Sequence, residues 1–342
     1  MKIKLQTLFC FLTTVIVFLF YLHTLNYPWK LFDEQIIYNE TILPIPLSFS
    51  EIIDYLTFFG INNLFEASNP FYSTISHIRG TPIDVIFNFL VFLCLKKSAF
   101  LYHLFSLILH ILNTCLFFFI IDKISLKFSK TSDYSSAFRL SLVSILTLFW
   151  ALHPINVESI LFASNYGALV TYFFCLTFLN FYLKDTRLKL NVLNFLLLIF
   201  LYMFPLLLNE YSVTLPLIIF SYLFADQLFK DKSISYKSSF LKSLNKIMPM
   251  VFALVLFIVY FYSLPTIRTT QESSILISLE RIFWLSPQIF LHYLKLMFSP
   301  VHLSIDQTDL VYLSNSLLQP YAIFSSILMY LLILITFISL FF

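Results

Sequence analysis

Runs of about 17–25 apolar residues recur along the sequence, and each is long enough to cross a hydrocarbon core of roughly 30 Å. Of the 342 residues, 59% are hydrophobic and 11% are charged, and the mean hydropathy is +0.87. Lipid offers the backbone no hydrogen-bond partners, so a spanning segment must satisfy its own peptide groups, as a helix does. The sequence therefore predicts an all-α, polytopic integral membrane protein in contact with membrane lipid.

Eight apolar segments are predicted to cross the membrane, and two further stretches, 83–95 and 279–298, raise the upper limit to ten. The eight segments are residues 7–25, 99–121, 139–152, 163–183, 190–208, 212–229, 247–263 and 320–342. The first segment is longer than a typical signal core and lacks a small-x-small cleavage site, which indicates an uncleaved signal anchor. We expect a single membrane domain over residues 1–342, with no repeat domain.

Positive charges orient these segments. Three stretches between crossings are rich in Lys and Arg, namely residues 123–139, 184–189 and 230–246. Successive stretches are separated by two crossings, so they share one side, and basic loops favour the cytoplasm. The N-terminus joins that side only if residues 83–95 do not cross, so we expect this stretch to lie as a helix in the outer interface. Residues 26–98 then form the first extracytoplasmic loop, in the periplasm, the cell exterior or the ER lumen.

This topology brings polar groups from separate parts of the chain to the extracytoplasmic face, as a site requires. They are Asp33, Arg79, His153, Glu158 and Glu210. The stretch 279–298 contains charged residues that are costly in lipid, so we expect it to dip into or lie along the same outer interface.

The acidic pair Asp33–Glu34 lies in YPWKLFDEQIIYNE, the first polar sequence after the first apolar segment. Neighbouring carboxylates can supply a general base, bind a divalent ion or simply be solvated. The sequence alone gives the solvated role about equal weight to the functional ones, and a divalent metal cofactor stays open.

Two other carboxylates lie where apolar segments end. In HPINVE, residues 153–158, His153 and Glu158 could orient a substrate or bond the backbone locally, and residue statistics favour the local role. Glu210 divides two apolar segments, where a carboxylate is costly unless it is paired or functional. Alternatively, Glu210 marks the boundary of a tight helical hairpin.

Two arginines are the predicted anion binders on the outer face. A guanidinium matches phosphate oxygens bidentately, so Arg79 or Arg281 could hold a lipid phosphate, or could simply touch lipid headgroups. His103 and His110, seven residues apart, share one helix face. We expect them to make interhelical hydrogen bonds rather than to bind metal, because no third ligand is evident.

Several classes of site are excluded or disfavoured. With only Gly60, Gly80 and Gly167, the chain has no glycine-rich phosphate loop. The four cysteines lack the spacing of a metal site and are expected to be small core residues. The net charge of +3 follows from the loops and the topology, and no nucleic-acid partner is predicted.

Taken in order, the motifs resemble a known family. They are FDEQIIYNE (32–40), RGTPIDVIFNFL (79–90), YHLFSLILHILN (102–113), ALHPINVESI (151–160), LLNEYSVTLP (207–216) and ERIFWLSPQIFLHYLKLMFSPVHLSID (280–306). This collinear series, over about residues 20–310, resembles the membrane domain of the transmembrane and tetratricopeptide-repeat O-mannosyltransferases and their bacterial relatives. Those proteins are GT-C glycosyltransferases, and ALHPINVESI is the most specific match.

The resemblance implies a membrane enzyme that transfers a sugar, with mannose as one candidate, from a polyprenyl-phosphate donor to an acceptor hydroxyl on a protein or glycan. It implies that Asp33 is the base, with Glu34 orienting the site or replacing it. Arg281 or Arg79 would hold the leaving phosphate, and the anomeric carbon would be inverted. The remaining motif residues implied to bind the donor are His153, Glu158, Glu210 and Asp306.

The sequence departs from the family at three points. Asn209 stands where a basic residue usually precedes the acid, and Tyr166–Gly167 stand where Arg or Arg-Lys is expected. The chain ends at Phe342 with no sign of the helical repeats that follow the membrane domain in the family. A catalytically degenerate subunit that binds a lipid or a partner is therefore the alternative. A transporter is a third possibility, disfavoured because the crossing segments hold few charged or Gly/Pro-broken positions in corresponding halves.

Overall fold

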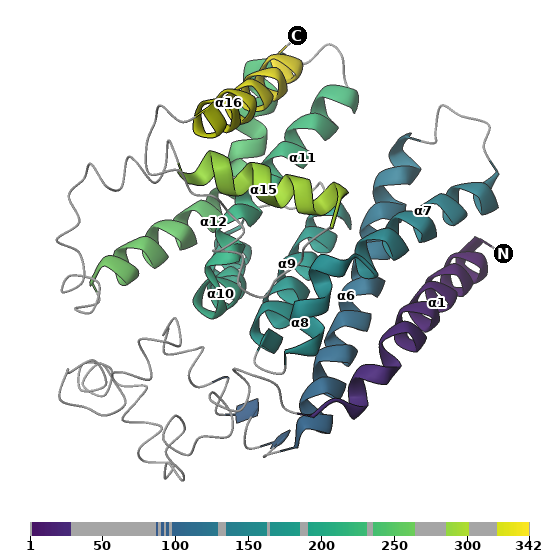
Figure 1. Ribbon diagram of the computed structural model, residues 1–342. Helices are drawn as coiled ribbons and strands as arrows, with labels where there is room; N and C mark the ends of the chain where they lie inside the picture. The colour runs from purple at the N-terminus through teal and green to yellow at the C-terminus, as the bar shows by residue number, and fades with distance from the viewer. Residues whose placement is uncertain are drawn as a thin grey trace, which may run out of the picture. The chain divides into compact units, whose positions relative to one another are not determined.

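The computed structural model describes residues 2–28, 87, 90–91, 94–95, 98–128, 135–162, 165–184, 191–230, 235–263, 285–300 and 320–341. Among these residues the regular structure is helical, and no strand occurs (Figure 1). The chain divides into two compact units, of which the first comprises Met1–Phe224 and Leu241–Tyr260. The second comprises Ala225–Phe240 and Phe261–Phe342.

The first unit contains most of the helices. They are α1 (Lys2–Tyr21), η1 (Leu22–Asn26), α6 (Ala99–Phe128), α7 (Ser136–Ala151), η4 (Pro154–Asn156), α8 (Val157–Leu161), α9 (Tyr166–Lys184), α10 (Val192–Leu208), η6 (Glu210–Thr214), and most of α11 (Leu215–Lys230) and α12 (Tyr236–Ser263). In the second unit, α15 (Ser286–Phe298) packs on α16 (Pro320–Phe341).

Several of these helices can span a membrane. In the described part of the chain, five are long and apolar enough: Leu5–Asn26, Ala99–Leu126, Tyr166–Leu183, Tyr211–Leu228 and Tyr236–Val259. A sixth results if α7 and α8, bent by 49° at the break between them, count as one span. Val192–Leu208 and Ile323–Leu332 are apolar but shorter. The protein is therefore an integral membrane protein with several spanning helices. All eight predicted segments coincide with described helices, but that all eight cross stays a prediction.

Large apolar side chains point outward from these helices. Val192 is 77% exposed, Phe200 74% and Ile145 60%. Such a surface is unfavourable in water and is suited to contact with lipid tails. Hydroxyls within the apolar helices are satisfied locally, since Thr13 Oγ1 donates to the Phe9 carbonyl at 2.8 Å and Thr14 Oγ1 to that of Phe11 at 2.9 Å.

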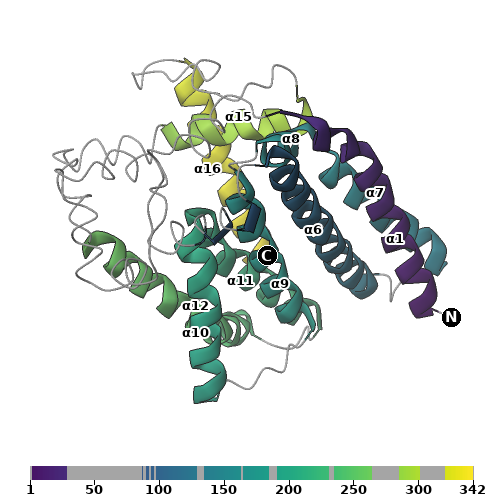
Figure 2. The same cartoon turned by 90° about the horizontal axis from the view of Figure 1, so that it is seen from below.

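The helix α6 is the centre of the first unit. It lies between α7 and α9 with α1 alongside, in both views (Figures 1 and 2). Three of its apolar side chains, Tyr102, Leu107 and Phe118, are buried in three separate clusters. Lipid tails are as apolar as these side chains, so the helices associate through close packing and interhelical hydrogen bonds.

Contacts between side chains fix the directions of α1 and α6. Gln6, near the start of α1, bonds Asp122 near the end of α6. Tyr21, at the end of α1, packs edge-on against His110, with ring centroids 5.4 Å apart. The two helices therefore run antiparallel, and the chain leaves α1 and enters α6 at the same end.

The helix α9 runs parallel to α6. Tyr102 and Tyr166, near the two helix starts, have ring centroids 5.9 Å apart, and Lys123 Nζ bonds Asn180 near the two ends. In the sequence, α7 and α8 come between these two helices and return the chain to the end of the unit at which α6 began. The helix α10 runs antiparallel to α9, since Phe174 lies against Phe204 and Phe178 against Tyr202, with ring centroids 4.7 and 5.9 Å apart.

The helices differ from the predicted segments where polar residues continue them. The helix α6 extends to Phe128, past the predicted end at 121, and α12 begins at Tyr236, before the predicted start at 247. In the ambiguous stretch 279–298, α15 has 13 residues, or roughly 20 Å, which is too short to span. Residues 87, 90–91 and 94–95 are helical. Phe87, Val91 and Leu95 pack in the cluster with the starts of α6 and α9; that the stretch lies in the outer interface stays a prediction.

Candidate functional site

Two of the predicted site residues, His153 and Glu158, are fully described by the structure. Glu210 begins η6, but its side chain lies outside the described part of the chain. The remaining predicted site residues also lie outside it: Asp33, Glu34, Arg79, Arg281 and Asp306. The described part of the predicted site is therefore the HPINVE motif and the helix ends around it.

A backbone break at Pro154 shapes this motif. Proline has no N–H and disfavours the helical conformation in the preceding residue. His153 accordingly has extended dihedrals (φ −61°, ψ 131°), and Pro154 opens η4, the first-turn position that proline tolerates. The helix α7 ends at Ala151, and α8 leaves at a bend of 49°.

At the break, the Leu148 carbonyl keeps its ordinary helical donor, whereas the Trp150 carbonyl takes new ones. The Leu148 carbonyl accepts from the Leu152 N–H at 2.8 Å. The Trp150 carbonyl, whose helical donor would be residue 154, accepts from the His153 N–H at 3.3 Å and from Asn156 Nδ2 at 2.6 Å. Buried backbone groups need such partners, and the motif itself supplies one of them through Asn156.

The Ala151 carbonyl is satisfied by other helices. It accepts from His110 Nε2 of α6 at 3.0 Å and from the Tyr21 hydroxyl of α1 at 3.4 Å. Both donors are buried, and a carbonyl can only accept, so Nε2 of His110 carries the hydrogen. The interhelical role predicted for His110 is confirmed. The break in α7 thereby depends on residues from α1 and α6.

His153 and Glu158 make local contacts. His153 is 8% exposed, and its Nδ1 accepts from the Ile155 N–H at 3.2 Å, which is the predicted local capping role. Glu158 is exposed, and its Oε1 accepts from Asn165 Nδ2 at 3.3 Å, across the turn into α9. The carboxylate is thus oriented at the surface of this helix end.

Several predicted motifs gather at this end of the first unit. The helix α6 contacts η1 and α8, α8 contacts α9, and α9 contacts η6. The stretch with Asp33 and Glu34 follows η1 in the sequence, and η6 begins with Glu210. Three motifs therefore begin at the same end of the first unit. They are the stretch that follows η1, the HPINVE motif at η4 and α8, and the turn that begins with Glu210.

Two positions that differ from the family have structural roles. Tyr166 is 4% exposed and packs among Phe87, Tyr102 and Phe105, with ring centroids about 6 Å from each. Asn209 caps η6, because its side chain accepts from the Tyr211 N–H at 3.2 Å. Neither residue supplies the positive charge that the resemblance would lead one to expect at these positions.

The hairpin between α10 and α11 is fixed by a buried tyrosine. Tyr202 is fully buried, and its hydroxyl donates to the Ser212 carbonyl at 2.7 Å. Ser212 Oγ in turn donates to the Asn209 carbonyl at 2.9 Å. These bonds hold the turn at which Glu210 begins η6; whether Glu210 is functional or only marks this boundary stays a prediction.

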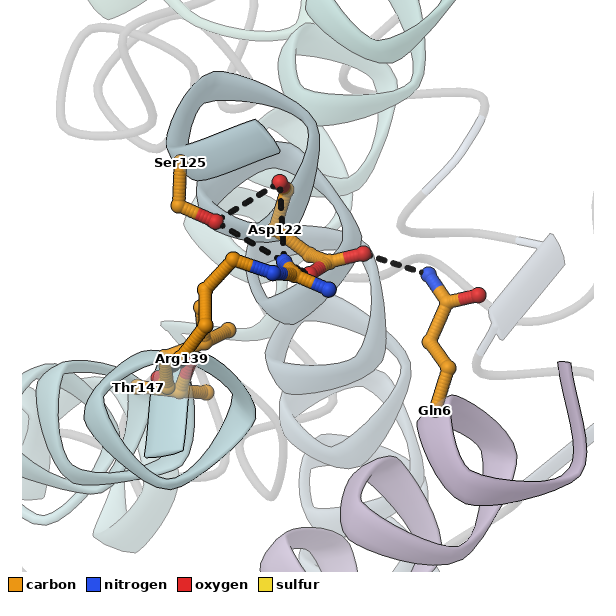
Figure 3. Close-up of polar contacts among 6 residues, drawn as sticks. Gln6, Asp122, Ser125, Arg139 and Thr147 are labelled. Carbon is orange, nitrogen blue, oxygen red and sulfur yellow. Dashed lines mark hydrogen bonds and ion pairs between the residues drawn. The ribbon is translucent and has the colours of Figure 1, made fainter. Parts of the chain in front are cut away.

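A buried network at the opposite end of α6 was not predicted (Figure 3). Asp122, 1% exposed, forms an ion pair with Arg139 of α7 and accepts from Gln6 Nε2 of α1 at 2.6 Å. Arg139 also donates to Ser125 Oγ at 3.0 Å. The sequence pattern places Arg139 in a basic loop, whereas in the structure it lies in the first turn of α7. The available signal was Asp122, a lone acid near the end of an apolar segment.

Polar residues also line one face of α6. His103, Ser106, His110 and Asn113 are all at most 1% exposed, and their spacing of three and four keeps them on one face. Asn113 Nδ2 donates to the Leu169 carbonyl of α9 at 2.9 Å. This stripe faces the neighbouring helices, as polar groups within a membrane span do.

No protein-family model matches the sequence, and comparison with curated proteins and with solved structures finds no similar protein.

Chemically, the described arrangement offers a fixed polar rim at one helix end rather than a complete catalytic group. Its oriented groups are the exposed Glu158 carboxylate and the His153 ring, both held by local hydrogen bonds. Of the two, the exposed Glu158 carboxylate can accept hydrogen bonds from a ligand, whereas the His153 ring is buried.

Proposed function

We propose that the protein is a multi-pass glycosyltransferase of the GT-C type that uses a polyprenyl-phosphate-linked sugar. The observation that carries the proposal is the Pro154 break, which lies in the most specific motif. Around it, His153 and Glu158 lie at the same helix end as η1, which leads to Asp33, and η6, which carries Glu210. The GT-C assignment itself rests on the order of the motifs in the sequence.

In the proposed reaction, Asp33 accepts the proton of the acceptor hydroxyl. The hydroxyl oxygen bonds to the anomeric carbon as the bond from that carbon to the phosphate oxygen breaks, with inversion. The leaving group is the polyprenyl phosphate, and Arg281 or Arg79 neutralises its charge through bidentate hydrogen bonds. Glu34 orients the acidic loop, while His153, Glu158, Glu210 and Asp306 contact the donor.

We further propose that the chain crosses the membrane eight times, with the N-terminus in the cytoplasm and the site outside. The antiparallel packing of α1 and α6 supports the placement of residues 26–98 on one side of the membrane. The reason is that the chain leaves α1 and enters α6 at the same end of the unit. The parallel course of α6 and α9 supports counting the bent pair α7–α8 as one crossing.

The second candidate function is a non-catalytic subunit that binds a polyprenyl-phosphate lipid or a protein partner. The burial of Tyr166 among aromatic rings favours it, because the family has a positive charge at that position. A site with less positive charge would hold the departing phosphate less strongly.

One experiment separates the two functions. Purified protein is incubated with a panel of polyprenyl-phosphate sugars, including mannose, and with peptides that contain Ser and Thr. Release of polyprenyl phosphate together with glycosylated peptide supports the enzyme. Saturable donor binding without release supports the subunit, and neither binding nor release contradicts both.

A further inference from the structure

A cavity opens between α6 and α9 near their C-terminal ends. Its volume is about 390 Å³, and it is lined by Phe119, Lys123, Thr177, Asn180 and Phe181. Phe181 and Thr177 are exposed, so the cavity opens on the outside of the helix pair rather than toward its core. Its walls combine a cation, a hydroxyl and a carboxamide with two aromatic rings.

The cation in this cavity is held in place. Lys123 Nζ donates to the Asn180 carbonyl at 3.3 Å and also to Asn180 Oδ1. The preceding residue, Asp122, is engaged on the other side of α6 by Arg139 and Gln6. Asp122 thus joins α6 to α7 and α1, whereas Lys123 joins α6 to α9. The hydrogen bonds to Asn180 hold the Lys123 ammonium at the cavity.

The depth of the cavity suits a lipid headgroup. From Tyr102 to Lys123 an α-helix rises by roughly 31 Å, about the thickness of the hydrocarbon core. Lys123 lies near the C-terminal end of the apolar span Ala99–Leu126, so its ammonium is within reach of the lipid phosphates when this helix crosses the membrane. Phe119 is one helical turn nearer the membrane centre, where a lipid's acyl chain continues.

We propose that this cavity binds the phosphate headgroup of an anionic membrane phospholipid. The Lys123 ammonium bonds the phosphate oxygens, with help from the Thr177 hydroxyl, and the first carbons of the acyl chains cover Phe119 and Phe181. Charge-assisted hydrogen bonds of this kind are stronger than neutral ones. The two rings, which a free phosphate would leave exposed, favour a lipid as the occupant. The site lies at the opposite end of α6 from the proposed sugar-transfer site and does not depend on it.

The test is native mass spectrometry of the purified full chain in neutral detergent at about 0.15 M salt. Phosphatidylglycerol and phosphatidylcholine of equal chain length are titrated separately. The wild type binds one phosphatidylglycerol more tightly than any phosphatidylcholine. Lys123→Met weakens that binding by roughly tenfold, the worth of one bond to a charged group. Thr177→Trp fills the cavity from an exposed position while leaving Lys123 in place, and it also abolishes the preference.

Lys237→Met is the matched control, because it removes the same charge from an exposed position on α12. Its binding stays within about twofold of wild type, since an exposed charge that does not line the cavity is screened at this salt. The proposal is overturned if Lys237→Met loses as much binding as Lys123→Met, or if Thr177→Trp retains full preference. Displacement of the lipid by an equal concentration of inorganic phosphate would also overturn it, in favour of a free-phosphate site.

Discussion

Nε2 of His110 lies 3.0 Å from the carbonyl oxygen of Ala151, the last residue of α7. This bond joins the middle of α6 to the point where Pro154 interrupts the next helix. A buried carbonyl without a partner costs about 1–3 kcal/mol. By giving the buried Ala151 carbonyl a donor, the bond offsets this cost at the point where the HPINVE motif interrupts the helix.

His110→Phe should destabilise the protein by about 1 kcal/mol, since the Tyr21 hydroxyl can still donate to the Ala151 carbonyl. The double variant Tyr21→Phe/His110→Phe removes both donors and should lose about 2–3 kcal/mol. Heat-induced unfolding in detergent measures both. His23→Phe, at an exposed histidine, is the control and should be neutral. Equal stability of the double variant and wild type would show that the carbonyl does not need these donors.

Asp122→Leu should be strongly destabilising, by about 3–5 kcal/mol, because it leaves the Arg139 charge in a largely buried position without its partner. Adding Arg139→Met should restore most of that loss, since an apolar pair of similar volume replaces a buried ion pair with little cost. The yield of monodisperse protein and the unfolding midpoint report the effect. If the double variant is as unstable as Asp122→Leu alone, the unpaired Arg139 charge is not the cause of the lost stability, and the prediction is wrong.

Cys10 and Cys115 should form an intramolecular disulfide on mild oxidation, because both belong to the side-chain cluster in which α1 packs on α6. The measurement uses the Cys94→Ser/Cys175→Ser background and detects the loss of two hydrogens by intact mass. Oxidation of the background that also carries Cys115→Ser should give no such loss. Failure of Cys10 and Cys115 to cross-link would contradict the packing of α1 on α6.

In a cysteine-free background, a cysteine at Lys127 should be protected from an impermeant maleimide in intact cells, and a cysteine at Ser68 should react. The reasons are the basic stretch after α6 and the extracytoplasmic assignment of residues 26–98. Reaction at Lys127, or protection at Ser68, would overturn the proposed topology.

The apolar spans were predictable from sequence because hydropathy reports the lipid-crossing part of a helix. The segments 163–183 and 190–208 match α9 and α10 closely. Hydropathy does not report where helical hydrogen bonding stops. For that reason α12 begins at Tyr236, in a stretch that the sequence assigns to a basic loop.

Interactions between helices were less predictable. Gln6 and Asp122 are 116 residues apart, and only the antiparallel packing of α1 on α6 brings them together. Cys10 and Cys115 meet for the same reason, whereas Cys94, expected in the core, is exposed. By contrast, the capping role of His153 was foreseen, because Pro154 next to it dictates the local backbone.

The most direct test of the account is the rate at which the purified protein releases polyprenyl phosphate from its donor, compared between wild type and Asp33→Asn. A positioned base typically contributes about 10²–10⁴-fold in rate, and Asn keeps the size of the side chain but cannot take the proton. The account predicts a fall of that order with donor binding retained, a smaller loss in Glu34→Gln, and unchanged activity in the control Asp54→Asn from the same loop. Full activity of Asp33→Asn would contradict it.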